Sequence, residues 1–349
     1  MRRLPIYFLI DVSESMVGEP IELVQDGMAT IIKELRTDPY ALETVWVSII
    51  AFAGQAKTIA PLLEIISFYP PKFPVGSGTS LSAGLGHLMY ELKKNIVPTT
   101  PQQKGDWKPI VFLITDGVPT DSPSDLQAVI AEWKHKWQRS ANMVVITFGK
   151  NTDNKILGEL TENVLYFDNS DANAYKQFFK WVTASIKTSS ISVENNSTGF
   201  ELARLDDRMS KIDLSKEVRQ PVVDDNFVVL VAKCQNSKQP YLIKYRKNVF
   251  ENNNGDIVLE YRLVGAFRVD NTYFEMSDEN AGDLKISTEK LKGAPTCPCC
   301  GNQFGFAYDE TCGKIHCIGM EEISTCPWCG GQAQYGFGEG GFDVNRTRG

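Results

Sequence analysis

Leu4-Pro5-Ile6-Tyr7-Phe8-Leu9-Ile10-Asp11-Val12-Ser13-Glu14-Ser15 begins as a mostly apolar run and then changes abruptly to an acid and two hydroxyls. An apolar run of this length with β-forming residues predicts a buried strand. In an open α/β sheet, ligands bind at the carboxyl ends of the strands, which is where Asp11, Ser13 and Ser15 fall. Their oxygens are ligands that a hard divalent cation accepts. Taken alone, the same residues also suit a simple helix cap.

Two later stretches favour the ligand-binding interpretation over the cap. Residues 109–114 form a second apolar run, and it ends in Thr115-Asp116-Gly117. A glycine-rich turn, Gly76-Ser77-Gly78-Thr79-Ser80, precedes a helical pattern of apolar residues. Parallel strands would bring all of these loops to one edge of a sheet.

The alternation of strands and helices over residues 1–188 predicts the fold class. Apolar runs at 45–52, 109–114, 143–149 and 164–167 alternate with segments of helical periodicity, and residues 56–60 suit a short edge strand. Nearly continuous apolar strands alternating with helices predict an α/β fold, a doubly wound and mostly parallel sheet with helices on both faces.

With these loops in place, the first half of the chain resembles a von Willebrand factor A domain. The resemblance lies in the metal-ion-dependent adhesion site, written Asp-x-Ser-x-Ser with a distant Thr and a distant Asp. It carries over to five residues, which are Asp11, Ser13, Ser15, Thr79 and Asp116. The resemblance implies that they hold Mg²⁺ or Mn²⁺ in a Rossmann-like domain covering residues 1–188.

Length, charge and cysteine usage limit the remaining possibilities. A chain of 349 residues is long enough for two domains. Its net charge of -7 argues against a nucleic-acid partner, and no apolar run reaches the length of a membrane span. Seven of the eight cysteines lie between Cys297 and Cys329, a clustering typical of metal binding in a reducing compartment. We therefore expect a soluble cytoplasmic protein.

The second half predicts a linker, a β-rich domain and a tail. The polar character of residues 189–226 predicts a linker, within which Leu202, Leu205, Met209 and Ile212 have the spacing of one short amphipathic helix. Residues 227–335 predict a smaller β-rich metal-binding domain, starting with a hairpin of 227–231 and 241–245. Residues 336–349 are rich in glycine and predict a flexible tail.

Two cysteine knuckles predict a zinc ribbon at residues 295–332. Each has the form Cys-Pro-x-Cys-Gly, in which two thiolates on a tight turn can bind one tetrahedral Zn²⁺. Two such knuckles predict one closed structural site, formed by Cys297, Cys300, Cys326 and Cys329. Residues 304–308 and 314–318 between them can pair as the hairpin of the ribbon.

The other cysteines leave alternatives open. Cys312 and Cys317 can belong to a second, partial metal site, with Cys299 or His316 as a further ligand. Alternatively they are structural, since free cysteine often behaves as a small buried hydrophobe. Cys234, alone in the β region, is predicted to be structural.

A β-rich segment with paired knuckles behind an A domain resembles the C-terminal metal-binding domain of TerY-type proteins. That family belongs to bacterial tellurite-resistance and stress-response gene sets. The resemblance implies a cytoplasmic, non-enzymatic adaptor that works beside a protein kinase and a protein phosphatase. It would bind a partner's Asp or Glu carboxylate through the divalent cation.

Two rival functions use the same residues differently. One is a metal-dependent phosphohydrolase using Asp11 and Asp116, but His87 and His135 are predicted to be solvated rather than placed as a base. The other is a zinc-module interaction protein in which the A domain is only structural. A cross-braced pair of zinc sites is not expected, because the cysteine order lacks a fourth ligand pair.

Overall fold

The computed structural model describes residues 2–116, 118–148, 154–167, 172–194, 200, 202–205, 209–212, 225–252, 255–278, 284–336 and 340–347. It consists of two compact units. The first contains Met1–Phe73 and Thr79–Gln220, and the second contains Pro74–Gly78 and Pro221–Gly349.

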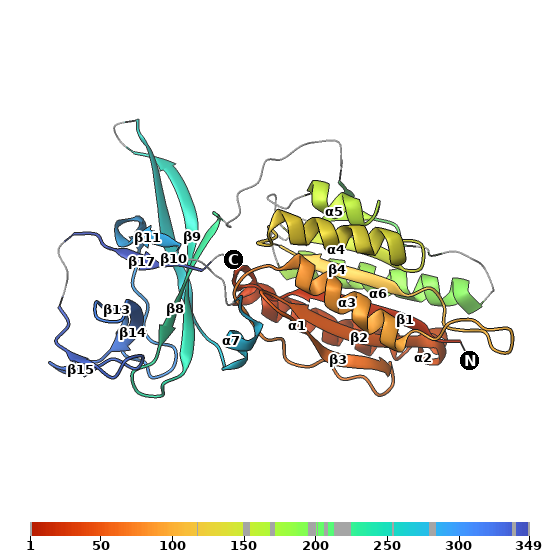
Figure 1. Cartoon of the computed structure of the whole chain (residues 1–349), viewed down its shortest axis with the longest axis horizontal. Helices are drawn as coiled ribbons and strands as arrows, with labels where there is room; N and C mark the ends of the chain where they lie inside the picture. Colours follow the sequence, from red (N-terminus) through yellow and green to blue (C-terminus); the bar gives the residue numbers. More distant parts are fainter. Residues whose placement is uncertain are drawn as a thin grey trace. The chain divides into compact units, whose positions relative to one another are not determined.

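The first unit is built on a seven-stranded sheet in the order β3-β2-β1-β4-β5-β6-β7 (Figure 1). Strands β2, β1, β4, β5 and β6 are parallel to one another, whereas the edge strands β3 and β7 pair antiparallel with β2 and β6. The strands are β1 (Leu4–Asp11), β2 (Val45–Phe52), β3 (Ala56–Glu64), β4 (Ile110–Thr115), β5 (Asn142–Phe148), β6 (Val164–Phe167) and β7 (Met209–Lys211).

Helices cover both faces of this sheet, and its central strands, β1 and β4, are therefore buried at every position. Helices α3, α4 and α5 pack on one another and share a core with the strands, whereas α1, α2 and α6 form a second packed group. The helices are α1 (Glu19–Leu35), α2 (Pro39–Thr44), α3 (Leu81–Asn95), α4 (Pro123–Lys136), α5 (Asn154–Leu160) and α6 (Ala172–Glu194), with a 3₁₀ turn η1 (Glu14–Met16).

Close approach of α1 and α6 depends on one glycine. A Cβ atom on Gly27 would lie 2.0 Å from the ring of Phe179, which is less than any real contact distance. A side chain at position 27 would therefore push the two helices apart.

The predicted α/β class and its main strands are confirmed, but the predicted linker is partly wrong. Helix α6 continues to Glu194, and Met209–Lys211 form strand β7 on the sheet edge rather than part of a helix. Ile212 packs on the apolar core next to this strand, which explains why its apolar spacing resembled an amphipathic helix.

The second unit is built on a six-stranded sheet in the order β12-β10-β9-β8-β14-β13. The predicted hairpin of β8 and β9 and the ribbon hairpin of β13 and β14 are both present. The elements are β8 (Phe227–Lys233), β9 (Pro240–Glu251), β10 (Ile257–Arg268), α7 (Thr272–Met276), β11 (Lys285–Ser287), η2 (Thr288–Lys290), β12 (Leu291–Lys292), β13 (Phe304–Asp309), β14 (Lys314–Ile318), β15 (Ser324–Thr325), β16 (Gln332–Ala333) and β17 (Asp343–Asn345).

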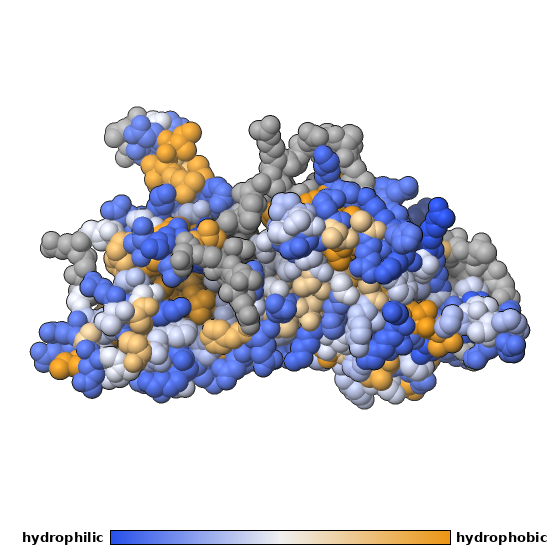
Figure 2. All heavy atoms as spheres, viewed as in Figure 1, coloured by the Kyte–Doolittle hydropathy of each residue, from blue (hydrophilic) through white to orange (hydrophobic). Residues whose placement is uncertain are grey.

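The outer part of the β9–β10 hairpin projects from this sheet, and Figure 2 shows apolar side chains gathered on it. Strand β10 continues through residues 257–268, with a register irregularity between Leu263 and Gly265.

The predicted flexible tail is also partly wrong. Strand β17 pairs with β11, and Val344 is buried in the core of the unit. The backbone N–H of Thr347 donates to the carbonyl of Val229, and Arg346 donates to the carbonyl of Phe227. The buried Val344 and these hydrogen bonds hold the backbone of residues 340–347 against the unit, although the segment before them is rich in glycine.

Candidate metal centres

The first candidate centre lies at the carboxyl ends of strands β1 and β4. Asp11 is the last residue of β1, Ser13 precedes η1, and Ser15 is inside it. Asp116 directly follows β4, and Thr79 lies just before α3. The parallel register of β1 and β4 places these strand ends side by side, as the sequence predicted.

Direct hydrogen bonds join four of the five predicted residues. Ser13 Oγ lies 3.0 Å from Ser15 Oγ, and Ser15 Oγ donates to Asp116 Oδ1 over 2.7 Å. The backbone N–H of Ser13 donates to Asp11 Oδ1 over 2.9 Å. Thr115, which the sequence pattern did not identify as part of the site, donates its hydroxyl to Asp11 Oδ2 over 2.6 Å.

Thr79 joins the same group through its backbone. Its N–H donates to Thr120 Oγ1 over 2.9 Å, and its carbonyl accepts from the N–H of Thr120 over 2.9 Å. Thr120 belongs to the loop that begins at Asp116. One loop therefore carries the distant acid and also fixes the distant threonine, and all five predicted residues belong to one connected region.

The donor set of this region fits a hard cation. Asp11, Ser13, Ser15 and Thr79 are all buried, and burial raises the pKa of the Asp11 carboxyl although Thr115 and Ser13 donate hydrogen bonds to it. A buried carboxylate is costly unless a positive charge compensates it. An oxygen-only set of two acids and three hydroxyls suits Mg²⁺ or Mn²⁺.

Asp121 positions Thr79 without belonging to the motif. Its carboxylate accepts from Ser80 Oγ over 2.7 Å and from the N–H groups of Leu81 and Ser82 over 2.8 and 3.1 Å. These are the first N–H groups of α3, which have no partner inside the helix. The sequence signal was Thr120-Asp121 in the same loop as Asp116, but nothing in the local pattern showed that Asp121 would reach α3.

We expect Asp121→Ala to weaken divalent cation binding about tenfold although no ligand is lost, because partners that orient metal ligands typically contribute that much. Isothermal titration with Mn²⁺ measures the effect. The matched control is Ser122→Ala, which removes the N-cap of α4, where Ser122 Oγ accepts from the N–H of Asp125. Equal Mn²⁺ affinity of Asp121→Ala and the wild type would contradict the positioning role.

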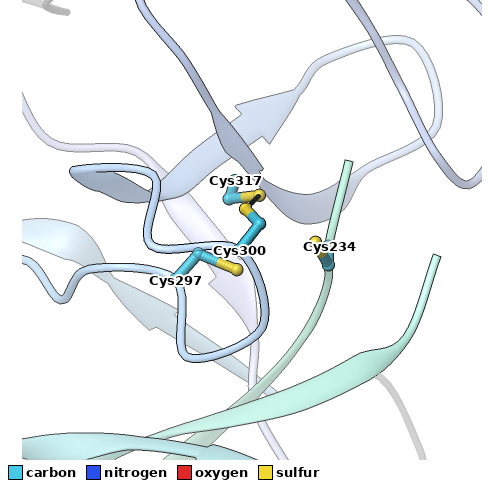
Figure 3. A group of neighbouring side chains, drawn as sticks. All are labelled: Cys234, Cys297, Cys300 and Cys317. Carbon is cyan, nitrogen blue, oxygen red and sulfur yellow. Dashed lines mark hydrogen bonds between the residues drawn. The ribbon is translucent and has the colours of Figure 1, made fainter. Parts of the chain in front are cut away.

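The second candidate centre is a group of four cysteines in the C-terminal unit. Cys234 follows β8, Cys297 and Cys300 form the first knuckle, and Cys317 lies on β14. Figure 3 shows the four side chains gathered from these three segments. Their sulfurs all lie within 4.8 Å of one another, and Cys300 Sγ is 3.7 Å from Cys317 Sγ.

The third candidate centre contains Asp309, Cys312, Cys326 and Cys329, with their ligand atoms again within 4.8 Å of one another. Cys312 Sγ lies 3.8 Å from Cys326 Sγ, and Cys329 Sγ lies 3.3 Å from Asp309 Oδ2. Hydrogen bonds, first from Cys326 and also from Cys329, lower the pKa of the Asp309 carboxyl to about 2. The carboxylate is therefore available as a fourth ligand beside three thiolates.

Each knuckle turns on a glycine in the left-handed region. Gly301 has a φ of 78°, and its N–H donates to the carbonyl of Cys297. Gly330 also has a φ of 78°, and its N–H donates to the carbonyl of Cys326. Other residues rarely adopt this conformation, so the glycine lets the backbone fold over the two sulfurs.

The predicted grouping of the cysteines is therefore wrong. The two knuckles do not share one site: Cys297 and Cys300 belong to one cluster, and Cys326 and Cys329 to the other. Cys312 and Cys317, left open between a metal and a structural role, are divided between the two clusters. Cys234, predicted to be structural, completes the four-cysteine cluster.

The clusters also alternate along the chain, which corrects the expectation that no cross-braced pair would form. After Cys234, the ligands of the four-cysteine cluster and of the Asp309 cluster take turns along the chain. Cys297 and Cys300 belong to the four-cysteine cluster, Asp309 and Cys312 to the other, Cys317 again to the four-cysteine cluster, and Cys326 and Cys329 to the other. The ligands counted as missing are Cys234, far away in sequence, in the first cluster and the carboxylate of Asp309 in the second. His316 is not in either cluster; its Nε2 lies 2.8 Å from the hydroxyl of Tyr335.

Tetrahedral sets of thiolates, with or without one carboxylate, favour Zn²⁺. Burial, followed by the effect of Asp309, raises the pKa of the Cys326 thiol to about 12. A neutral thiol is a poor ligand, so a bound cation would have to lower this pKa, as zinc does in structural sites.

Comparisons with known proteins also divide the chain into an N-terminal and a C-terminal domain. Residues 6–181 match the model of the von Willebrand factor type A domain, and residues 224–349 match the model described as the TerY-C metal binding domain. No curated protein matches the chain. In the described part of the chain, no helix is both long and apolar enough to cross a membrane.

Several solved structures are similar over part of the chain. Proximal thread matrix protein 1 from the mussel byssus is 16% identical with a TM-score of 0.38, over 53% of this chain and 48% of that protein. The PilB minor pilin from Streptococcus sanguinis is 14% identical with a TM-score of 0.38, over 53% and 61%. A von Willebrand factor type A protein from Catenulispora acidiphila is 13% identical with a TM-score of 0.39, over 81% and 70%. The chain thus spans about half to three fifths of the first two proteins.

Proposed function

Because the chain belongs to the von Willebrand factor type A family, with a TerY-C metal-binding domain behind the A domain, we propose that it is a non-enzymatic adaptor that binds an acidic side chain of a partner protein through a divalent cation. The observation that carries the proposal is the hydrogen-bonded group of Asp11, Ser13, Ser15 and Asp116, with Thr79 fixed beside it. These residues would hold the ion.

The charges of the five residues explain why the ion would accept a further ligand. Asp11 and Asp116 together neutralise a divalent cation, while Ser13, Ser15 and Thr79 supply neutral oxygens. Because no further acid of the set adds negative charge, and five ligand groups would leave one position of an octahedral ion open, a carboxylate from outside could still bind. Asp116 is only partly buried, so the site can be reached from its side. The partner group would be an Asp or Glu.

The placement of the three histidines supports an adaptor over a phosphohydrolase. His87 lies on α3 and its Nε2 is 2.8 Å from Thr58 Oγ1, so it is half-buried and bonded rather than solvated as predicted. His135 lies in the last turn of α4, and His316 is buried beside Tyr335. None of the three belongs to the group around Asp11, where a positioned base would be needed. Mn²⁺-dependent turnover of a phosphate ester by the wild type, lost in Asp11→Ala, would favour the enzyme instead.

The two cysteine clusters would serve as the zinc-stabilised platform of the C-terminal unit. They require reduced thiols, which fits a cytoplasmic protein. The resemblance to TerY-type proteins extends the proposal to a kinase and a phosphatase of a bacterial tellurite-resistance or stress system as the source of the partner carboxylate.

The proposal predicts cation-dependent capture of a partner. The immobilised full chain should retain at least one protein from the cytosol of its source cells in Mg²⁺ or Mn²⁺, and lose it in chelator. Asp11→Ala should lower the captured amount at least tenfold, because it removes one of the two acids that hold the ion. Quantitative mass spectrometry measures the captured proteins.

The matched control is Asp26→Ala, which removes an exposed acid of α1. It should capture the partner as the wild type does. Capture that survives both the chelator and Asp11→Ala would contradict the proposal and would favour the zinc-module function.

A further inference from the structure

Strands β9 and β10 extend beyond the strands on either side of them. Strand β8 pairs with β9 only as far as Phe227 and Arg246, and β12 pairs with β10 only at Tyr261 and Arg262. The backbone N–H of Lys247 still donates to the carbonyl of Asn226. Beyond those points, residues 248–251 and 257–260 pair only with each other among the described strands. We call this two-stranded projection the arm (Figure 1).

One face of the arm is apolar and exposed. Residues directly opposite in an antiparallel pair share a face, and here the opposite pairs are Ile257 with Glu251, Leu259 with Val249, and Tyr261 with Lys247. The exposed fractions are 80% for Ile257, 54% for Val249 and 40% for Leu259. At the base, Tyr261 is 6% exposed and belongs to the core of the unit. The apolar face therefore continues outward from the core.

The opposite face of the arm is satisfied within the chain. Glu260 Oε1 accepts from Asn248 Nδ2 over 3.1 Å and from Arg262 Nε over 2.7 Å. The Arg262 guanidinium also lies over the ring of Phe250, 5.9 Å from its centre. Phe250 on this opposite face is also 38% exposed, but the other face carries three exposed apolar side chains, up to 80% exposed at Ile257. The face with more exposed apolar surface is the one suited to meet another surface.

The charges on the apolar face identify that surface. Lys247 at the base and Glu251 near the tip lie on the same strand and the same face, with Val249 between them. If two arms pack face to face and antiparallel around a two-fold axis at Val249 and Leu259, Glu251 of one chain meets Lys247 of the partner subunit. A pattern that is complementary to its own inverted copy is the mark of an isologous interface.

We propose that the apolar face of the arm is a homodimer interface, occupied by the arm of a second copy of this chain. Each arm offers only a few apolar side chains, so the interface is small and the dimer is reversible. We expect a dissociation constant on the order of 1–100 µM, as for other small interfaces.

Sedimentation velocity of the full chain, zinc-loaded and reduced, tests the proposal over roughly this concentration range. The wild type should shift from monomer to dimer. Leu259→Asp should weaken the dimer at least tenfold, because it places a charge at the centre of the apolar contact. The control Ile323→Asp changes an apolar residue away from the arm that is 62% exposed, and it should leave the dimer unchanged.

A charge exchange tests the antiparallel geometry. Glu251→Lys and Lys247→Glu should each weaken self-association at least tenfold, since each brings like charges together. An equimolar mixture of the two variants should dimerise as the wild type does, because both ion pairs are restored between unlike subunits. Glu322→Lys, an exposed acid away from the arm, is the control for a change of net charge.

Zinc content and circular dichroism confirm that each variant is folded. A wild-type chain that stays monomeric throughout the range would overturn the proposal, and so would a dimer insensitive to Leu259→Asp or a mixture that fails to associate. Capture of a different protein by the arm of a monomeric chain would equally overturn it.

Discussion

Removing zinc is expected to unfold the C-terminal unit and to leave the A domain folded. The four-cysteine cluster joins the end of β8, the first knuckle and β14, and three of its cysteines are part of the buried core. Strands β8 and β14 pair over only two residue positions, so few backbone bonds hold them together without the ion. Apparent binding energies of structural zinc, about 10–16 kcal/mol, are as large as the stability of a whole domain.

The decisive variant is Cys317→Ser, whose thiol is buried in the first cluster. We expect it to lose at least one of two zinc ions and to lose amide protection over residues 225–347, while the strands β1, β4 and β5 stay protected. Metal analysis and hydrogen exchange measure the two effects. The matched control is Cys299→Ser, because Cys299 is the middle residue of the first knuckle but belongs to neither cluster.

The stoichiometry separates the observed clusters from a single shared site. Two zinc ions per wild-type chain, with one retained after Asp309→Ala or Cys326→Ser, fit the alternating clusters. One zinc ion per chain, lost in the Cys329→Ser and Cys300→Ser variants alike, would instead support the site in which both knuckles bind the same ion.

The A domain could be predicted because its signals are local. Each central strand is an apolar run, and a parallel sheet places the ends of such runs at one edge, which brings Asp11 and Asp116 together. Short elements gave no comparable signal. Helix α2 has six residues and α5 has seven, too few for a periodic pattern to stand out, and β7 has three.

The cysteine clusters could be predicted only in pairs. Local spacing shows that Cys297 and Cys300 can bind one ion, but it does not show which second pair completes the site. That choice depends on the hairpin of β13 and β14 and on Cys234, far away in sequence. One signal was present and unused: Asp309-x-x-Cys312 repeats the spacing of the knuckles with a carboxylate in place of the first thiolate.

Asp11→Asn is expected to stabilise the A domain in chelator and to abolish its stabilisation by Mg²⁺. Burial raises the pKa of Asp11, so its favourable contribution to the metal-free fold is greatest below the ordinary Asp pKa and is lost as the pH rises through the raised value. At neutral pH the carboxylate is therefore a cost to the fold. Asparagine removes the charge and can still accept the hydrogen bond from the N–H of Ser13.

We expect a gain of about 1–2 kcal/mol in the free energy of unfolding of the metal-free variant, or roughly 3–6 °C in its melting temperature. The wild type should gain about 2.7 kcal/mol when Mg²⁺ is present at a hundred times its dissociation constant, and Asp11→Asn should gain almost nothing. Thermal unfolding of the full chain, with the zinc sites kept loaded, gives both numbers from the transition of the A domain.

Thr115→Val is the control that isolates the charge. It removes the hydroxyl that donates to Asp11 Oδ2 but keeps the carboxylate, so it should destabilise the metal-free domain where Asp11→Asn stabilises it. If Asp11→Asn also lowered the melting temperature in chelator, the Asp11 carboxylate would stabilise the metal-free fold through its hydrogen bonds. Its burial would then not indicate a cation site. If Mg²⁺ still stabilised the variant, the ion would bind elsewhere. The opposite signs of the two substitutions thus separate a buried acid kept for a metal from one kept for structure.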